Sequence, residues 1–275
     1  MRLRIEQKIR KRLRLARGYE AELVPKLRPY VRRGIRLEIA LESIMLDTTE
    51  GHLLRGTAAQ VLAINDNHTP VALLLKQFFE QTEKVELWKT ALSLEHLGDR
   101  CAIQPLIEAL HDPNPHRRHA AARALGWIPK AGNRAADALI AALTDPSQPQ
   151  PVREEAAESL AYLHSQRSIA ALISVLSDPD ERIRFWAVFA LGTICDRRTG
   201  RHTDRRVVPA LESMLNDHAI PPGNWWSVGR EALAMLGHLD PPEADYRERL
   251  ANATQLVLED PNSSPEDRHW AEGYQ

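Results

Sequence analysis

The chain has 275 residues, of which 43% are apolar and 5% aromatic, and its formal net charge is −1. No run of 18 apolar residues is present, so the sequence predicts no membrane-spanning helix. Two cysteines, Cys101 and Cys195, are too few for a disulfide framework, and the N-terminus lacks the apolar core of a signal peptide. We therefore expect a cytoplasmic protein.

The N-terminal segment is strongly basic. Residues 1–36 carry thirteen Lys or Arg against three Glu, which leaves the rest of the chain at −11. Residues 2–17 are predicted to form a helix with one apolar stripe, made of Ile5, Ile9, Leu13 and Ala16. We interpret residues 1–34 as a capping helix and linker that covers the first repeat. The alternative is a recognition arm for a nucleic-acid backbone, an anionic membrane or an acidic partner.

The chain that follows contains an internal repeat. A first copy begins at Asp47, and in it Arg55 precedes a stripe of small and apolar residues. A degenerate copy at 91–98 has Thr90 at the position of the arginine. The clearest copies are DPNPHRRHAAARALG at 112–126 and DPDERIRFWAVFALG at 178–192, with a variant at 145–161 between them. A last degenerate copy at 232–237 has Gly229 at the position where the arginine is expected. Repetition at this period indicates a repeat architecture.

Each clear copy is preceded by a second apolar-periodic run, such as IQPLIEAL before Asp112 and IAALISVL before Asp178. Each unit is thus predicted to be two helices joined by an Asp-Pro turn, because proline disfavours helical geometry in the residue before it. Asn114 and Asp180 are expected to cap the second helices. A unit of this size cannot bury its own apolar face, so residues 35–275 are predicted to form an all-α superhelix of stacked helix pairs, an α-solenoid.

The Asp-Pro turn, the arginine, the Ala-Ala pair and the Leu-Gly end resemble HEAT repeats, in particular the short subtype found in phycobilisome lyases and many bacterial proteins. The resemblance implies a ladder of carboxylates and guanidinium groups between adjacent repeats, formed by Asp112, Arg118, Arg153, Asp178 and Arg184. A guanidinium fork satisfies a carboxylate and nearby carbonyls together, which makes a charge tolerable on a packed face. We therefore interpret these arginines as structural.

Signatures of catalysis and cofactor binding are missing from the sequence. It has no glycine-rich phosphate loop, no Gly-x-Ser-x-Gly elbow and no Cys-x-x-Cys pair, so an enzyme is not favoured and no cofactor is expected. His116 and His119 could share a helix face near Asp112, but a metal site needs further ligands held in place, and we predict none there. The repeated His-Glu pairs of HEAT-like di-iron hydroxylases are also missing.

Aromatic residues gather in two places. Phe185, Trp186 and Phe189 lie in one predicted second helix, and Trp225 and Trp226 follow the insertion AIPPGN. Because adjacent helical residues cannot both face the core, we expect at least one of these two tryptophans to be partly exposed. The rings either fill space between repeats or line a surface that binds a ligand.

A second insertion, CDRRTGRHTDRR, carries five arginines between Asp196 and Arg206. Insertions in a solenoid lie on its surface, where recognition residues gather. The predicted binding surface is therefore bordered by Arg197, Arg198, Arg201, Trp225 and Trp226, with Trp186 behind them. The alternative is a solvated loop with one tryptophan tucked beneath it.

Two classes of function fit this sequence. One is a non-catalytic scaffold or adaptor whose surface binds an acidic or partly apolar segment of a protein partner. The resemblance to phycobilisome lyases implies the other, a chaperone that handles a tetrapyrrole. Binding of DNA, as in HEAT-like alkylpurine glycosylases, is less favoured and would show a strong dependence on salt.

Overall fold

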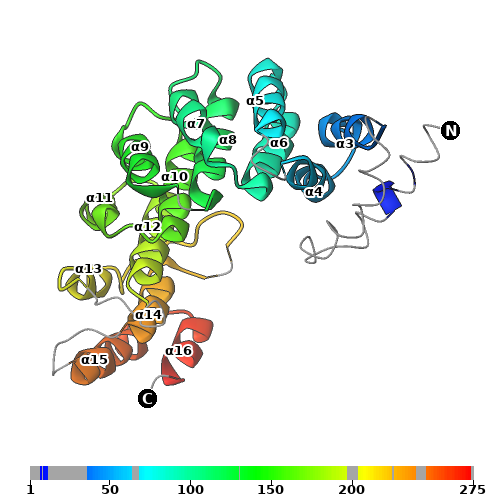
Figure 1. The fold of residues 1–275 in the computed structure, drawn as a ribbon. Helices are drawn as coiled ribbons and strands as arrows, with labels where there is room; N and C mark the ends of the chain where they lie inside the picture. Colours follow the sequence, from blue (N-terminus) through cyan, green and yellow to red (C-terminus); the bar gives the residue numbers. More distant parts are fainter. Residues whose placement is uncertain are drawn as a thin grey trace. The chain divides into compact units, whose positions relative to one another are not determined.

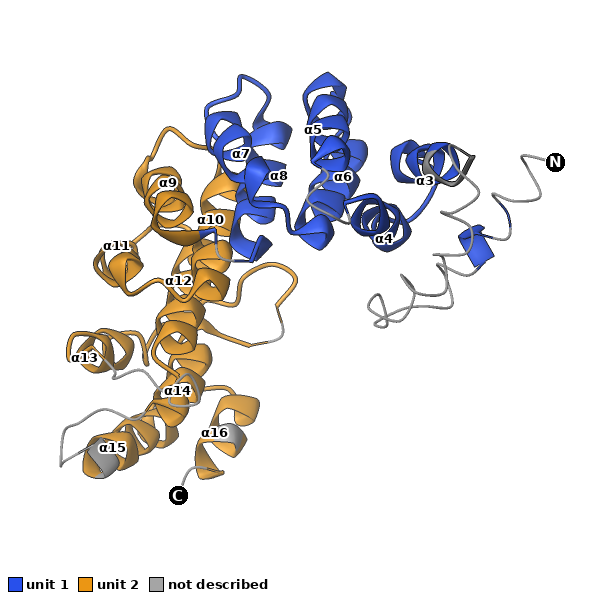
Figure 2. Cartoon of the chain, viewed as in Figure 1, with its two compact units in different colours: residues 1–131 blue, residues 132–275 orange. Residues whose placement is uncertain are grey.

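The computed structural model describes residues 7, 9–11, 36–63, 68–129, 131–196, 204–224, 226–239 and 246–273. It divides into two compact units, residues 1–131 and residues 132–275 (Figure 2). Throughout the described ranges the regular structure is helical, and Asp196 and Leu239 form one isolated antiparallel bridge. The all-α prediction is therefore confirmed, while the predicted boundary after residue 34 lies outside the described residues and stays a prediction.

Unit 1 is a stack of helix pairs. In chain order its elements are α3 (Arg36–Leu46), α4 (His52–Leu62), α5 (Thr69–Glu80), α6 (Lys84–Leu97), the short 3-10 helix η1 (Arg100–Ala102), α7 (Ile103–Ala109) and α8 (Pro115–Trp127). The second helices of consecutive pairs pack on each other, α4 on α6 and α6 on α8. The core of this unit is thus shared between neighbouring repeats rather than contained in any one of them.

Unit 2 repeats the same arrangement. Its elements are α9 (Gly132–Thr144), α10 (Gln150–Leu163), the 3-10 helix η2 (Gln166–Ser168), α11 (Ile169–Ser174), α12 (Glu181–Ile194), α13 (Val207–Glu212), α14 (Val228–His238), α15 (Tyr246–Glu259) and α16 (Pro265–Glu272). In Figure 1 α9, α11 and α13 form one row of this unit, and α10, α12 and α14 form the second. The protein is therefore an α-solenoid built from helix pairs, as predicted.

The Asp-Pro turns begin the second helices as expected. The side chain of Asn114 accepts a hydrogen bond of 2.9 Å from the backbone N–H of His116, and Asp180 does the same for Arg182 at 2.9 Å. Both contacts satisfy a helix-start N–H group that has no partner within the helix. The predicted caps Asn114 and Asp180 are therefore confirmed.

The repeat arginines of unit 2 connect successive repeats. Arg153 on α10 donates to the backbone carbonyl of Leu143 at 2.9 Å and to the carboxylate of Asp178 in the next turn at 2.5 Å. Arg184 on α12 donates to the carbonyl of Asp178 at 2.8 Å and to both carboxylate oxygens of Asp217, at 2.7 and 3.2 Å. Each guanidinium group therefore bonds to its own repeat and to the following one.

Two adjacent arginines, Arg117 and Arg118, lie in the first turn of α8 in unit 1. Arg118 donates to the backbone carbonyls of Asp112 and Pro113, and the carboxylate of Asp112 pairs with the neighbouring Arg117 at 2.7 Å. Arg117 also donates to the carbonyls of Phe79 and Gln81 at the end of α5, at 3.1 and 2.6 Å. Arg117 thus connects α8 to the preceding helix pair of unit 1.

The earliest repeat arginine, Arg55, is completely buried on α4. It donates to the carbonyl of Met45 at 2.8 Å, to the side chain of Gln77 and, more weakly, to Thr90 at 3.4 Å. Thr90 stands where the next repeat lacks its arginine. Neutral side-chain oxygens therefore replace the carboxylate as acceptors in this part of the stack.

The described part of the N-terminal segment contacts the first repeat. Ile9 is buried, and Arg10 pairs with Asp47, at 3.0 Å, and with Glu50 in the turn between α3 and α4. Burial of Ile9 agrees with the predicted apolar stripe, and Arg10 is bonded to the repeat. Most of the predicted helix over 2–17 lies outside the described residues, so its capping role stays a prediction.

The tight packing around Gly229 explains why the last degenerate repeat lacks an arginine. A Cβ atom at this position would lie 2.3 Å from the backbone oxygen of Leu215, and the Gly229 N–H group donates to the carbonyl of Asp217 at 2.8 Å. The start of α14 thus lies against the end of the preceding turn too closely for any side chain. No arginine fits at this point.

Replacing Gly229 by Ala is expected to lower the free energy of unfolding by about 1–3 kcal/mol, because backbone atoms must shift to admit the methyl group. Gly51→Ala is the matched control, since a Cβ there meets nothing within 4 Å. Its effect should stay within about 0.5 kcal/mol. Urea denaturation of both variants checks the prediction, and equal stabilities would contradict the close approach.

Candidate functional site

A pocket of about 590 Å³ opens on the second row of unit 2. It is lined by residues of α10, α12, α14 and the turn before α14, namely Tyr162, Phe185, Trp186, Phe189, Gly223, Asn224, Trp226 and Glu231. Its volume lies within the range of about 300–1,000 Å³ that is typical of ligand pockets. Five of the eight lining residues are aromatic, in a chain with few aromatic residues.

The aromatic wall of the pocket is built on α12. Trp186 and Phe189 are three residues apart and share a helix face, and their ring centroids lie 5.4 Å apart at 88°. Tyr162 on the neighbouring helix α10 approaches Phe189 with a centroid distance of 6.4 Å. Edge-to-face packing of this kind favours a fixed arrangement of rings. The wall is therefore ordered by contacts among its own side chains.

A carboxylate fixes the orientation of Trp186. The indole N–H group donates to Glu154 on α10 at 3.1 Å, and the other oxygen of Glu154 accepts from Gln150 at 2.7 Å. Arg182 lies 3.5 Å from the same carboxylate. The polar edge of Trp186 is thus satisfied by protein groups, and its apolar surface is left to line the pocket.

The insertion that ends in NWW folds back onto the start of α14. Asn224 donates its backbone N–H to the carbonyl of Pro221 at 2.9 Å, and Val228 donates to Ala219 at 3.0 Å. Gly223 has a φ of +90°, a conformation that residues with a Cβ atom rarely adopt. This tight return brings Trp226 to the rim of the pocket.

Trp226 is 37% exposed and is held by two residues of α14. Its indole N–H group donates to Glu231 at 2.6 Å, and the guanidinium group of Arg230 lies 5.4 Å from its ring centroid. Glu231 is only 5% exposed. Burial raises the pKa of Glu231, and the hydrogen bond from Trp226 and the charge of Arg230 oppose that rise less strongly. The pocket thus contains a carboxyl group that is costly to ionise.

A carboxyl group whose pKa is higher in the folded than in the unfolded protein lowers stability as the pH rises through the folded-state pKa. Glu231→Gln removes this cost and keeps an oxygen that accepts the Trp226 hydrogen bond. We expect the variant to be more stable than the unchanged protein at neutral pH, and the gain to disappear below the ordinary carboxyl pKa of 4.5. Thermal unfolding across this pH range measures the difference.

The control for this prediction is Glu80→Gln on α5, where the side chain is 66% exposed. It should change stability little at either pH. A loss of stability in Glu231→Gln at neutral pH would show that the pocket stabilises the charge.

Trp186 and Trp226, two of the sequence-predicted site residues, line the same pocket although 40 positions separate them. Trp226 supplies the partly exposed tryptophan that the sequence predicts. Arg197, Arg198, Arg201 and Trp225 lie outside the described residues, so their part in the site stays a prediction. Arg206, which belongs to the same insertion, is exposed, and its guanidinium group lies 2.8 Å from the carboxylate of Asp204.

Two residues of the pocket, Tyr162 and Glu231, are not predicted from the sequence. Tyr162 is a single aromatic residue in a neighbouring repeat, and only the packing of α10 on α12 brings it beside Phe189. Glu231 becomes part of the pocket because the insertion folds back and places Trp226 over it. No local pattern marks either residue.

The histidines near Asp112 do not assemble into a site in the described part of unit 1. The Asp112 carboxylate pairs with Arg117, and the ring of His119 packs against Trp88 with a centroid distance of 4.9 Å.

HEAT repeats match the sequence over residues 71–150 and 137–222, more than half of the chain. The protein is therefore a repeat protein of the α-solenoid class. The chain belongs to the HEAT-repeat family. A search of the curated proteins found no match.

Three solved structures illustrate the similarity to known folds. A designed armadillo repeat protein is 17% identical, with 74% of this chain and 97% of that chain covered and a TM-score of 0.47. The complex of CpcE and CpcF of phycocyanin lyase from Nostoc sp. PCC7120 is 20% identical, with coverages of 86% and 94% and a TM-score of 0.45. Human deoxyhypusine hydroxylase is 19% identical, with coverages of 98% and 94% and a TM-score of 0.39.

The described helices are all too short or too polar to cross a membrane.

Proposed function

We propose that this protein is a non-catalytic HEAT-repeat scaffold of the cytoplasm that binds a segment of a protein partner, with the aromatic pocket of unit 2 as the anchor site. The observation that carries the proposal is the convergence of Tyr162, Trp186, Phe189 and Trp226 on one open pocket. Aromatic side chains dominate the binding energy of many protein interfaces, where they surround a desolvated anchor. A large apolar side chain of the partner fits this environment.

Polar groups around the pocket suit recognition rather than catalysis. Glu154 and Glu231 are both engaged by indole N–H groups, and each orients a ring. In this proposal Arg197, Arg198 and Arg201 contact acidic residues of the partner beside its apolar anchor, because an arginine fork binds a carboxylate through two hydrogen bonds. The partner segment is thus apolar at one position and acidic at its flanks.

A tetrapyrrole is the second candidate ligand. The observation in its favour is the same aromatic, mostly apolar lining, in a pocket of a size typical for small ligands. Mixing the purified protein with a bilin and recording the absorbance tests this alternative. A shifted and intensified bilin spectrum that Trp186→Ala abolishes would favour it over the scaffold.

Capture from native lysate followed by a peptide competition tests the scaffold. The immobilised chain is expected to retain a partner, and one overlapping peptide of that partner should release it. Replacing the large apolar residue of that peptide by Ala should remove the competition, whereas replacing a polar neighbour should not. If competition depends only on the net charge of the peptide and weakens steeply with salt, the aromatic pocket is not the anchor site. Binding would then be purely electrostatic, as it is for a nucleic-acid backbone.

A further inference from the structure

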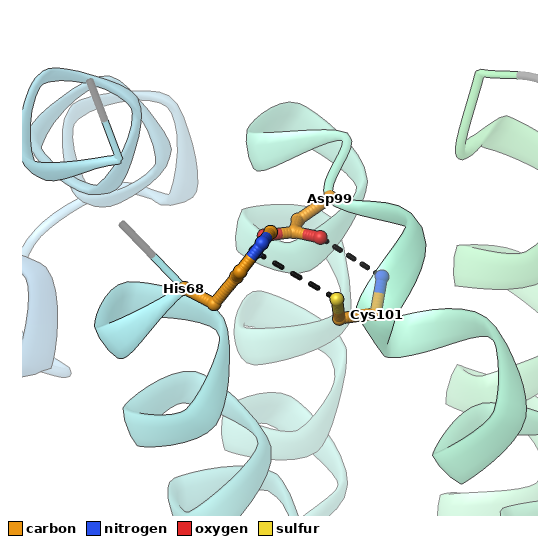
Figure 3. A group of neighbouring side chains, drawn as sticks. All are labelled: His68, Asp99 and Cys101. Atoms are coloured by element: carbon orange, nitrogen blue, oxygen red, sulfur yellow. Dashed lines mark hydrogen bonds and ion pairs between the residues drawn. The ribbon is translucent and has the colours of Figure 1, made fainter. Parts of the chain in front are cut away.

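Three side chains of the kinds that can bind a metal ion, His68, Asp99 and Cys101, lie together in unit 1 (Figure 3). His68 stands immediately before α5, and Asp99 and Cys101 lie at the start of η1 one repeat later. The Nδ1 atom of His68 lies 2.8 Å from a carboxylate oxygen of Asp99 and 3.6 Å from the sulfur of Cys101. All three potential ligand atoms lie within 4.8 Å of one another. Packing of α5 against η1 brings the three residues together.

The Asp99 carboxylate is oriented by the chain itself. One of its oxygens accepts the backbone N–H of Cys101 at 2.8 Å and so caps η1, while the other oxygen faces His68. A second hydrogen bond that fixes a ligating carboxylate is a usual feature of metal sites. The Asp99 side chain is 13% exposed, whereas that of His68 is 59% exposed, so solvent reaches the cluster from the side of His68.

The distances suit a small tetrahedral ion. Metal–ligand bonds of about 2.0–2.3 Å at tetrahedral angles place the ligand atoms about 3.3–3.6 Å apart. The distance of 3.6 Å between His68 Nδ1 and Cys101 Sγ meets this condition. The 2.8 Å between His68 and Asp99 is the length of a direct hydrogen bond, and it has to widen by about 0.5 Å when an ion replaces the shared proton.

The same geometry disfavours a nucleophilic cysteine. A Cys-His-Asp relay uses opposite nitrogens of the imidazole, one for the nucleophile and one for the acid. Here a single nitrogen, Nδ1, faces both Asp99 and Cys101. Convergence of sulfur, nitrogen and oxygen on one point is instead the arrangement of a metal site.

We propose that His68, Asp99 and Cys101 bind a zinc ion, with the fourth position open to water or to a ligand from a partner. Thiolate and imidazole together select zinc among the common divalent ions, whereas magnesium and calcium prefer oxygen ligands. On binding, the Cys101 thiol releases its proton to solvent, and His68 binds through Nδ1 with its proton on Nε2. The ion connects the start of α5 to the start of η1 and so joins two successive repeats. This site is independent of the aromatic pocket in unit 2.

Cobalt titration of the full chain tests the site, because a cobalt–thiolate bond gives a charge-transfer band and tetrahedral coordination gives intense visible bands. The chain has two cysteines, and Cys195 is buried in unit 2, so Cys195→Ala leaves Cys101 as the sole thiol. We expect this variant to bind about one equivalent of Co²⁺ with a thiolate band, and excess Zn²⁺ to remove the band. Cys101→Ser should lose the band, and His68→Gln and Asp99→Asn should weaken binding by more than about tenfold.

A second readout separates metal binding from a change in fold. Zn²⁺ should slow alkylation of Cys101 by iodoacetamide in the Cys195→Ala variant and raise its melting temperature, and it should not raise that of Cys101→Ser. A thiolate band that persists in Cys101→Ser, or a full chain that binds neither Co²⁺ nor Zn²⁺ at this cluster, would overturn the proposal.

Discussion

Arg153→Ala is expected to lower the free energy of unfolding by about 3–5 kcal/mol, because it leaves a buried charge without its partner. The Asp178 side chain is 8% exposed and receives the Arg153 guanidinium at 2.5 Å. The substitution also removes the donor to the carbonyl of Leu143. Urea denaturation followed by circular dichroism measures the change.

Arg167→Ala is the matched control within the same unit. Arg167 pairs with Asp137 at 3.0 Å, but the two side chains are 57% and 52% exposed, so the loss should be at most about 1 kcal/mol. Adding Asp178→Ala to Arg153→Ala should recover part of the lost stability, since no unpaired carboxylate then remains. Equal effects of Arg153→Ala and Arg167→Ala would show that the buried pair does not hold the repeats together.

Trp186→Ala with Trp226→Ala is expected to abolish partner capture while the helical content stays unchanged. Each ring lines the pocket, and loss of an aromatic anchor typically costs at least about 2 kcal/mol of binding energy. That cost corresponds to roughly a 30-fold weaker affinity per ring. Affinity is measured with the competing partner peptide, and helical content is measured by circular dichroism.

Phe79→Ala serves as the control for exposed aromatic surface in general. Phe79 is 41% exposed on α5 in unit 1 and does not line the pocket. Its replacement should leave capture unchanged. Capture that survives the double tryptophan variant, or that Phe79→Ala removes equally well, would rule the pocket out as the anchor site.

The repeat pattern predicted the helix pairs, their Asp-Pro turns and the caps at Asn114 and Asp180, because these depend on local geometry and short spacings. It also selected Arg153 and Arg184, whose partners lie where the repeat places them. The repeat pattern did not predict the contact of Arg117 with the end of α5, because the neighbouring Arg118 occupies the repeated arginine position.

The candidate site was harder to predict than the repeats. Aromatic clustering identified Trp186 and Trp226, but Glu231 joins them only through the folded-back insertion. No local motif marks the cluster of His68, Asp99 and Cys101, because His68 lies about one repeat before the other two residues. Comparing residues at equivalent places in successive repeats would have brought them together, since stacking puts such residues side by side.

Photo-crosslinking from within the pocket tests the central claim most directly. A benzophenone amino acid replaces Tyr162, which lines the pocket, or Phe79, which lies outside it. Each variant is first shown to capture the partner and is then irradiated. We predict a covalent product with the partner from position 162 and none from position 79. The assignment of the aromatic pocket as the binding site would be contradicted if both variants capture the partner but only position 79 gives a covalent product.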